Sequence, residues 1–540
     1  MDIFDIYLNA SSLTKTIIGS YWVLIGMITA LYLRYFSIRG FIFSIIWIIV
    51  SFFIITLLTD IPIYYFTILY LVPSLILALP LIFLFRFLGD YFEAPEKPLL
   101  VKVFLKGKRK PLLVNTQLGV AINGAAGSGK TASGAVPILK HYGRNNVGGA
   151  VYDYKDFELT EMVMEFYKDS EIPVYVFAPF DPTRSIQYNV LDPKFISSDE
   201  QLKMICLCIT ANLMPEGGND GKFFMEAAEG AIVGITYILR DKYPKYCSFT
   251  YLAAIFLSKD VEELVDLIES SRNATIQARA FLDGAFSPKQ MAAVKGTISN
   301  AFAKIANPKT FYTLSRTSVD FSLNESGNKA VLCAVNKPSL DLIYEPVLSV
   351  VMQSLIQSMS ERDRDPSYLL LDEATTLKIN RIVKVPATMR SFKVATIYMV
   401  QDIVQSTIQI GRDKMKALFA NLSVKYFGKT NDPDTAKFYE SYFDEKDFSR
   451  LSKSFKSSGW SETDRRTTKS EQKEKEVKSY ETMKRKAGQF YIFDQNGNLT
   501  DGSIKLPSFK TKSIQPTNPI SDYELERYYD SVFSNVKSIK

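Results

Sequence analysis

A shortage of histidine and cysteine sets the first limits on the chemistry of this chain. His141 is the only histidine among the 540 residues, which excludes a histidine-rich metal site. A Ser-His-Asp triad would have to be built on His141, and no nucleophile partner stands near it in the sequence. The four cysteines make neither a Cys-x-x-Cys pair nor a zinc-ligand spacing, so we expect buried, reduced thiols in a cytosolic domain.

The chain also lacks a large excess of either charge. Its 64 basic and 57 acidic residues leave a formal net charge of +7, so only local clusters inform on anionic partners. For the basic cluster at 106–110 we expect either contact with anionic lipid headgroups or an exposed turn. The segment 452–486 is rich in Lys, Glu and Ser and contains Trp460. Its composition leaves two alternatives, a contact with single-stranded nucleic acid or a solvated linker or hairpin.

Long apolar stretches fill the N-terminal part. They run over 17–33, 41–58 and 64–84, each close to the ~20 residues that cross a bilayer. The acidic start and the two further stretches argue against a cleaved signal peptide. Arg34 and Arg39 follow the first stretch and Arg86 follows the third, so the positive-inside rule places the rest of the chain in the cytoplasm. We expect a multi-pass anchor over 1–95, with three spans, or with two spans and one flat or re-entrant stretch.

A nucleotide-binding motif follows the short apolar run at 118–123. The residues Gly-Ala-Ala-Gly-Ser-Gly-Lys-Thr at 124–131 form a complete GxxxxGK[ST] P-loop, with helix-compatible residues after it. Its glycines let backbone N–H groups turn toward phosphate oxygens, and the helix N-terminus adds a positive field. We expect Lys130 to reach the β- and γ-phosphates of ATP and Thr131 to ligate Mg²⁺. The eight positions expected to bind the nucleotide are Gly124, Ala125, Ala126, Gly127, Ser128, Gly129, Lys130 and Thr131.

The apolar run at 368–371 ends in two acids, Asp372 and Glu373. Such a run is typical of a buried parallel strand whose carboxyl end meets a ligand. We expect Asp372 to hold Mg²⁺, directly or through water, and Glu373 to orient and activate the attacking water. A kinase needs a bound acceptor and usually lacks this glutamate, so hydrolysis is the predicted reaction.

A further strand-like run, 395–400, ends at Gln401. We expect the Gln401 side chain either to sense the γ-phosphate or to be a helix cap or a surface amide. Arg390 lies between the acidic pair and this run. In a ring of subunits Arg390 is a candidate arginine finger, in competition with Arg381 and Arg412, and the alternative for each is a solvated arginine.

Helical periodicity dominates the segment 198–321, where apolar residues recur three and four positions apart. Strand-like runs stand on either side of it. We therefore predict an α/β fold with a mainly parallel sheet and an inserted all-helical domain. The predicted domains are the anchor (1–95), the P-loop ATPase domain (96–197 and 322–451), the helical insert (198–321), a charged flexible segment (452–486) and a C-terminal completion of the ATPase domain with a tail (487–540).

Taken in order, these motifs resemble those of the type IV secretion system coupling proteins, the TraG/TraD-like conjugation ATPases, over nearly the whole chain. After the anchor and the P-loop, 151–159 is similar to the family's D-x-K-G-E-L run and 180–193 to its FDP…YNPL pattern. The segments 368–377 and 401–411 are similar to its Walker B and QS…Q…YG elements. The chain departs from the pattern where Asp156 and Phe157 replace the usual glycine and where Phe224 replaces a common tryptophan.

The resemblance implies a RecA-like P-loop ATPase domain with a helical insert, a homo-hexameric ring, and a place in the inner membrane with the ATPase domain in the cytoplasm. It implies that Lys130 and Thr131 bind nucleotide and that Gln401 is a sensor. The implied cofactors are ATP and Mg²⁺. The implied partners are single-stranded DNA with its relaxase, components of the type IV secretion channel, and membrane lipid. Some relatives pass protein, so the sequence leaves DNA and protein open as cargo.

Two other functions stay open. An FtsK-like translocase of double-stranded DNA would need no secretion channel, although no C-terminal winged-helix pattern accompanies the motor motifs. A membrane receptor for protein cargo would use nucleotide only for assembly and would keep working without hydrolysis.

Overall fold

The computed structural model describes residues 97–540, except 197, 215–221, 285–287, 444, 457–463 and 476. The residues from Lys97 onward form a unit of their own. The apolar stretches predicted to span the membrane lie outside the described residues, and so does the choice between two and three spans.

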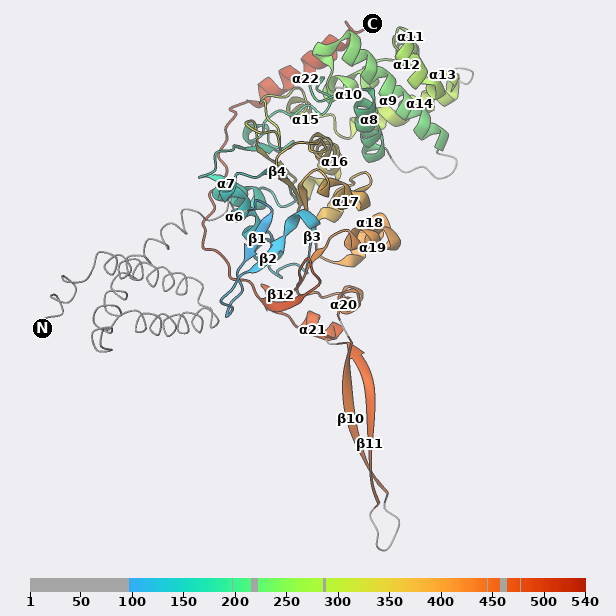
Figure 1. The fold of residues 1–540 in the computed structure, drawn as a ribbon. Helices are drawn as coiled ribbons and strands as arrows, with labels where there is room; N and C mark the ends of the chain where they lie inside the picture. Colours follow the sequence, from blue (N-terminus) through green and yellow to red (C-terminus); the bar gives the residue numbers. More distant parts are fainter. Residues whose placement is uncertain are drawn as a thin grey trace, which may run out of the picture. The chain divides into compact units, whose positions relative to one another are not determined.

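A sheet of nine strands organises the described unit (Figure 1). The strand order is β13-β12-β9-β3-β8-β7-β4-β6-β5, and the strands from β9 to β5 in this order run parallel. β12 pairs antiparallel with both β9 and β13. The mainly parallel sheet predicted from the sequence is therefore confirmed. The strands are β3 (Val120–Asn123), β4 (Gly148–Asp153), β5 (Val174–Phe177), β6 (Val331–Val335), β7 (Ser367–Leu371), β8 (Val394–Val400), β9 (Val424–Phe427), β12 (Gln489–Phe493) and β13 (Leu499–Ser503).

Alternate residues of the central strands pack into two cores, one on each face of the sheet. In β7, Leu369 and Leu371 belong to one core, and Tyr368 and Leu370 belong to the other. Strands buried on both faces carry continuous apolar runs, which is why these segments are recognisable in the sequence. One face is covered by α6 (Val136–Arg144), α7 (Glu158–Tyr167) and the hairpin of β1 (Leu100–Val103) and β2 (Leu112–Asn115). The other is covered by α16 (Asp341–Ser358), α17 (Val385–Arg390), α18 (Ile403–Ile410) and α19 (Arg412–Ala420).

One helical stretch among the described residues, Pro338–Ser358, is long and apolar enough to cross a membrane by length and composition. An 18-residue window within it has a mean hydropathy of 1.3, and 61% of that window is buried inside the protein. It contains α16, which packs on β4 and β6 of the sheet and on α8 of the helical segment described next. Most apolar residues of α16 from Tyr344 onward are therefore part of the core, whereas Leu342 is exposed.

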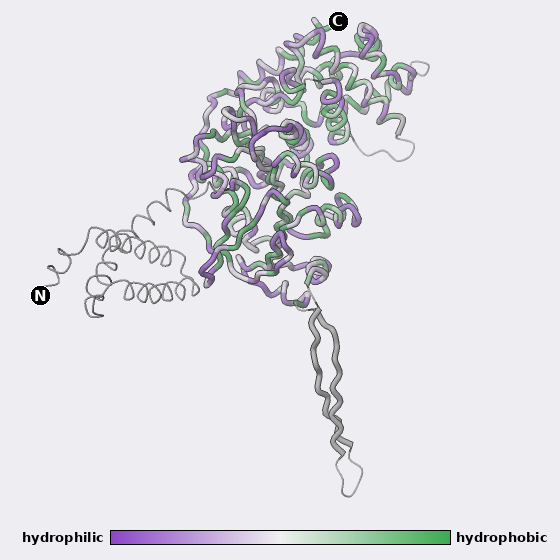
Figure 2. Tube along the Cα trace, in the orientation of Figure 1, coloured by the Kyte–Doolittle hydropathy of each residue, from purple (hydrophilic) through white to green (hydrophobic). Residues whose placement is uncertain are grey.

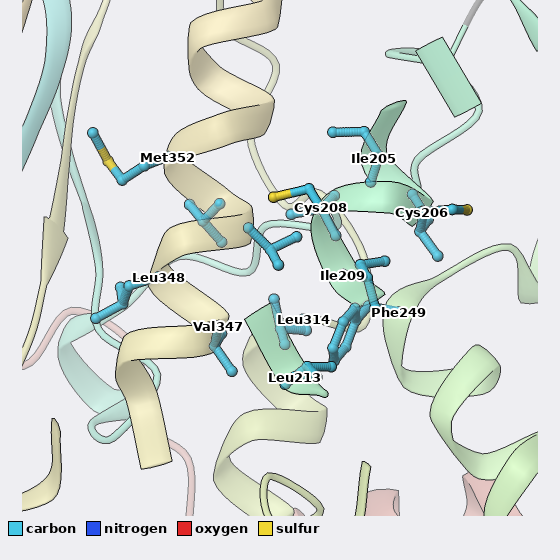
Figure 3. Close-up of a cluster of buried hydrophobic side chains, with 14 of the residues drawn as sticks. Ile205, Cys206, Cys208, Ile209, Leu213, Phe249, Leu314, Val347, Leu348 and Met352 are labelled. Carbon is cyan, nitrogen blue, oxygen red and sulfur yellow. The ribbon is translucent and has the colours of Figure 1, made fainter. Parts of the chain in front are cut away.

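Between β5 and β6 the described chain contains helices and no strand of the sheet. Ser198, Ser248 and Asp260 cap three of these helices, each accepting a backbone N–H three residues on. The buried apolar residues of α8, Phe249 of α10 and Val347, Leu348 and Met352 of α16 belong to one cluster (Figure 3), so the helical segment continues the core on that face of the sheet. The helices are α8 (Asp199–Leu213), α9 (Lys222–Lys242), α10 (Phe249–Ser258), α11 (Val261–Glu269), α12 (Arg272–Gln277), α13 (Arg279–Asp283), α14 (Pro288–Ala303) and α15 (Pro308–Thr313).

The C-terminal part of the chain returns to these helices. After β13, residues 505–521 form no helix or strand, and then α22 (Asp522–Val536) packs on α10 and α15. The Phe533 ring stacks on Phe311 of α15 with 5.9 Å between centroids, and Asn535 Nδ2 donates to the Tyr251 hydroxyl at 2.9 Å. The segment expected to complete the ATPase domain and end in a tail thus adds β12 and β13 to the sheet and then covers the helical insert.

The charged segment contains a hairpin. β10 (Glu445–Lys456) pairs antiparallel with β11 (Asp464–Lys475), and the short helices α20 (Pro433–Glu440) and α21 (Ser479–Met483) stand before and after it. Figure 2 shows that hydrophobic residues recur along the sheet and its covering helices, which is where the two cores lie.

Candidate nucleotide-binding site

The P-loop connects β3 to a π-helical turn, Lys130–Ala135, that continues into α6. Gly129 has a φ of +87°, a conformation that L side chains rarely adopt. A Cβ at Gly124 would lie 2.4 Å from Ser128 Oγ, so glycine is required there for space. The loop therefore has the conformation that the glycine spacing predicts, with the helix N-terminus at its end.

Backbone hydrogen bonds fix the P-loop to its surroundings. Gly124 N donates to Val400 O at the end of β8 (3.2 Å), and Ala125 N donates to Lys429 O beyond β9 (2.7 Å). Gly488 N, just before β12, donates to Ser128 O (2.8 Å). The antiparallel strands contributed by the C-terminal part of the chain thus support the nucleotide loop directly.

The Lys130 amine lies inside the curve of the loop. Its Nζ donates to Gly124 O at 2.7 Å and forms an ion pair with Glu373 Oε1 at 3.2 Å. Burial lowers the pKa of Lys130, and the neighbouring Glu373 opposes that shift. Gly124 O and Glu373 therefore provide the partners that this buried ammonium requires.

Asp372 and Glu373 stand at the carboxyl end of β7, beside the ends of β8 and β4. Asp372 is buried, and its Oδ1 has no hydrogen-bond partner among the described residues. Burial raises its pKa to about 7, with Lys155 the first of the charges that act against the shift. Glu373 has a φ of +46°, a left-handed conformation that costs about 1 kcal/mol or more for a residue with a side chain. Two acids, one unpaired and one held in a strained turn, meet at the P-loop.

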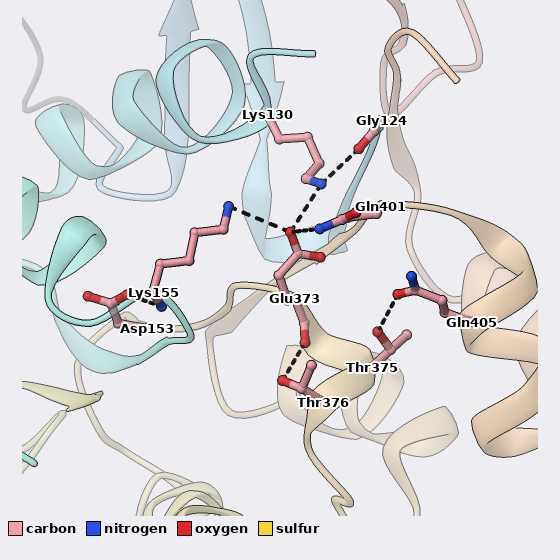
Figure 4. A network of polar contacts seen from close by, with 9 residues as sticks. All are labelled: Gly124, Lys130, Asp153, Lys155, Glu373, Thr375, Thr376, Gln401 and Gln405. Carbon is pink, nitrogen blue, oxygen red and sulfur yellow. Dashed lines mark hydrogen bonds and ion pairs between the residues drawn. The ribbon is translucent and has the colours of Figure 1, made fainter. Parts of the chain in front are cut away.

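Glu373 Oε1 is the point where three donors meet (Figure 4). Gln401 Nε2 donates to it at 3.0 Å, and the amines of Lys130 and Lys155 lie at 3.2 and 3.7 Å. The structure therefore brings together Lys130, Glu373 and Gln401, three of the residues singled out in the sequence. The Gln401 amide, expected to sense the γ-phosphate or to cap a helix, contacts the glutamate.

Lys155 belongs to the run at 151–159 that is similar to D-x-K-G-E-L, and the sequence alone gives it no role. It follows β4 after Asp153, a fully buried carboxylate whose Oδ1 accepts the Lys155 N–H at 3.0 Å. The available signal was an Asp-x-Lys sequence directly after a buried apolar strand. The sequence does not reveal that β4 lies beside β7, and this neighbourhood is what brings Lys155 to Glu373.

The residues that replace the family's glycine keep a left-handed turn. Asp156 and Phe157 have φ values of +49° and +75°. The Phe157 ring is buried against Phe180, with 5.6 Å between centroids, and the Arg184 guanidinium lies 4.0 Å above it. Packing of the Phe157 ring offsets the conformational cost of a turn that glycine adopts freely.

The candidate arginine fingers lie at the surface. Arg381, Arg390 and Arg412 are exposed, and among the described residues none of them makes a hydrogen bond or ion pair with the P-loop or Glu373. The Arg390 carbonyl accepts from Gln117 Nε2 at 3.3 Å, and Arg412 lines a groove of about 830 Å³ formed by α18, α19 and α20. The structure of one chain therefore does not favour any of these three arginines over the others as an arginine finger.

The polar groups around the loop fit a magnesium nucleotide. Ser128 Oγ, Asp372 Oδ1 and the side-chain amide of Asn123 are buried without partners in the described part of the chain. Buried polar atoms of this kind are normally satisfied, so their gathering beside a buried lysine marks a place for a polar ligand. Thr131 is the second residue of the turn that begins at Lys130, which is where the sequence predicts a magnesium ligand.

Comparisons with known proteins identify the family and a similar fold. Residues 96–480 match the family model described as type IV secretory system conjugative DNA transfer. The unbound bacterial conjugative coupling protein TrwBdeltaN70 has a similar fold, with a TM-score of 0.59, 15% sequence identity, and coverage of 77% of this chain and 90% of that one. TrwB in complex with the ATP analogue ADPNP has a TM-score of 0.59 and 14% identity, with coverage of 76% of this chain and 91% of that one. TrwB in complex with ADP and Mg²⁺ has a TM-score of 0.57 and 16% identity, with coverage of 76% of this chain and 90% of that one. No curated protein sequence matches the chain.

Proposed function

The chain belongs to the type IV secretory system conjugative DNA transfer family, and we propose that it is a membrane-anchored coupling protein that hydrolyses ATP with Mg²⁺ to drive DNA into a secretion channel. One observation carries the proposal. A complete P-loop, an unpaired buried aspartate and a restrained glutamate meet at the carboxyl ends of neighbouring parallel strands. This is the set of groups that phosphoryl transfer to water requires.

Lys130 has to exchange partners when ATP binds. Its amine is held by Gly124 O and Glu373 Oε1, and the β/γ-phosphate oxygens are stronger acceptors for the same ammonium. The exchange releases Glu373 from one of its donors. Nucleotide binding thereby converts an internally paired site into one whose glutamate faces the γ-phosphate.

Thr131 and Asp372 are the residues that would hold the metal. When bound, Mg²⁺ supplies positive charge that neutralises the developing charge on the phosphate oxygens. The unpaired Oδ1 of Asp372 supports this assignment, because a buried carboxylate without a partner is stabilised by a nearby cation.

Glu373 is the group proposed to act on the attacking water. Gln401 and Lys155 hold one of its oxygens, and the other is left to accept a hydrogen bond from water. Fixing the carboxylate before the reaction reduces the orientational cost of the attack. A ring of subunits, in which Arg381, Arg390 or Arg412 would reach a neighbour's nucleotide, completes the proposal. The homo-hexamer, the inner membrane location, the relaxase and the channel contacts belong to it as family properties.

DNA is favoured as cargo by the charge pattern of the β10–β11 hairpin. In the pairs from Glu445↔Lys475 to Ser449↔Glu471, every lysine stands opposite an acid. The pairs nearer the loop, from Arg450↔Ser470 to Lys456↔Asp464, contain six basic residues and only one acidic residue. Cations without opposite charges along a strand pair attract the phosphate backbone of a nucleic acid. The six are Arg450, Lys453, Lys456, Arg465, Arg466 and Lys469.

The hairpin offers a matched test of this contact. Replacing Lys453, Arg466 and Lys469 by Gln removes three charges near the loop, and replacing Lys446, Lys473 and Lys475 by Gln removes three near the root. Binding of a labelled single strand to the full chain, measured against salt, is expected to lose about 2 units of log–log slope in the first variant only. Equal losses in both variants would reject the hairpin as the contact. If the variant near the loop lost binding to anionic vesicles and kept binding to the single strand, these basic residues would be assigned to a lipid contact.

The motor itself is tested by Lys130→Ala in the full-length protein. Loss of DNA transfer is expected at normal abundance in the membrane, because the phosphates lose their main cation. Full DNA transfer by this variant would contradict the proposal that the protein is a motor. ATP hydrolysis stimulated by duplex DNA, with no dependence on a secretion channel, would favour an FtsK-like translocase instead.

A further inference from the structure

Lys155 belongs to the catalytic centre by geometry, although no P-loop motif includes it. Its Nζ lies 3.7 Å from Glu373 Oε1, the oxygen that also accepts from Gln401. The Lys155 side chain is 35% exposed, so it approaches the glutamate from the solvent side of the site, while Lys130 is buried at 5%. The two lysines reach the same oxygen from different loops (Figure 4).

The backbone that carries Lys155 is rigidly held. Asp153, buried at the end of β4, accepts the Lys155 N–H with one oxygen and both the N–H (2.8 Å) and hydroxyl (2.7 Å) of Thr160 with the other. On the far side, Asp156 N donates to Asn336 O at 3.0 Å. A flexible side chain thus starts from a fixed point, which limits the positions its ammonium can take.

Nucleotide binding changes the relative importance of these contacts. Once phosphate takes the Lys130 ammonium, Glu373 retains Gln401 and Lys155 as donors. Gln401 is neutral, so among the described side chains Lys155 is the remaining cation in contact with Glu373, whose neighbour Asp372 would hold Mg²⁺. Like charges this close repel, and a nearby cation keeps both side chains in place.

We propose that Lys155 is a positioning residue that holds the Glu373 carboxylate toward the attacking water once Lys130 has moved to the phosphates. The inference rests on the proposed ATPase function. The competing interpretation is a partly exposed ion pair at 3.7 Å, which contributes between nothing and about 1 kcal/mol and has no part in catalysis.

The test uses the full-length protein in lipid nanodiscs and two substitutions. Lys155→Met keeps the stem and removes the charge, and Lys155→Arg keeps the charge. For Lys155→Met we expect kcat to fall about 10- to 100-fold, the size of loss that misplacement of a catalytic group produces. The KM for ATP and the melting temperature are expected to stay within error of the wild type. Lys155→Arg is expected to recover at least half of the lost rate.

Lys337→Met is the matched control. Its Nζ also lies 3.7 Å from a carboxylate, Asp156 Oδ2, and its side chain is 40% exposed, yet it does not contact Glu373. Wild-type rates are expected for this variant. An unchanged kcat in Lys155→Met, or equal losses in Lys155→Met and Lys337→Met, overturns the inference and leaves the ATPase function standing. A rise in KM without a fall in kcat also overturns it, because it assigns Lys155 to nucleotide binding. Absence of ATP hydrolysis in the wild-type protein refutes the proposed function itself.

Discussion

The side-chain amide of Gln401 donates to Glu373 Oε1 at 3.0 Å, so the end of β8 restrains the carboxylate at the end of β7. β7 and β8 are hydrogen-bonded neighbours, so the pairing of these two strands determines how close Gln401 and Glu373 lie. Gln401 therefore supports the glutamate. A direct contact between Gln401 and the γ-phosphate stays a prediction.

Gln401→Ala is expected to lower kcat about tenfold with little change in KM, because the glutamate loses a donor that sets its orientation. Gln405→Ala is the control, since Gln405 Oε1 accepts from Thr375 at 3.3 Å and does not reach Glu373. Steady-state ATP hydrolysis by both variants decides the point. Equal rates of ATP hydrolysis in the two variants would show that Gln401 has no specific role in orienting Glu373.

Glu373→Gln is expected to bind ATP and fail to hydrolyse it. A neutral amide cannot take a proton from water, and loss of general-base assistance costs about 10²- to 10⁴-fold in rate. The amide still occupies the space between Lys130 and Gln401, so nucleotide affinity is expected to persist. Measuring bound ATP and DNA transfer in the same preparation separates a motor from a receptor, because a receptor keeps its function when hydrolysis stops.

Asp372→Asn is expected to stabilise the nucleotide-free protein and to abolish its response to Mg²⁺. Burying a carboxylate without a partner costs stability, so removing the charge raises the free energy of unfolding by about 1–3 kcal/mol. Thermal unfolding with and without Mg²⁺ and ATP measures both effects. A variant that melts lower than wild type without nucleotide would show that Asp372 is satisfied in the resting state.

Phe533→Ala is expected to destabilise the protein by about 1–3 kcal/mol, since the half-buried ring packs on Phe311 and on Tyr529. Tyr523→Ala serves as the control because Tyr523, in the same helix, is 75% exposed. Denaturant unfolding of the two variants provides the comparison. If Phe533→Ala unfolds at the same denaturant concentration as Tyr523→Ala, the docking of α22 contributes little to stability.

The sequence predicts those parts of the site whose chemistry is local. The P-loop glycines are needed for a turn within a few residues, and Asp372 and Glu373 follow a strand recognisable by its buried apolar run. The helical segment between β5 and β6 is visible for the same reason, since helical periodicity repeats over a few residues.

The parts that the sequence does not predict depend on strand order. Lys155 reaches Glu373 because β4 lies beside β7 in the sheet. In the chain, β5 and β6 separate these two strands. The support of Ser128 by Gly488 joins residues far apart in the chain, and nothing local marks either as a partner. Parallel sheets connect strands through long crossovers, so their neighbours cannot be deduced from the sequence of any one strand.

The docking of α22 on α10 and α15 also bears on how the chain is made. During synthesis α10 and α15 leave the ribosome before β6, and all strands from β6 to β13 are translated before α22. The aromatic face of the insert around Phe311 therefore lacks the helix that covers it until all strands of the nine-stranded sheet have been synthesised. The insert can therefore be completed only at the end of synthesis, although its own helices are made early.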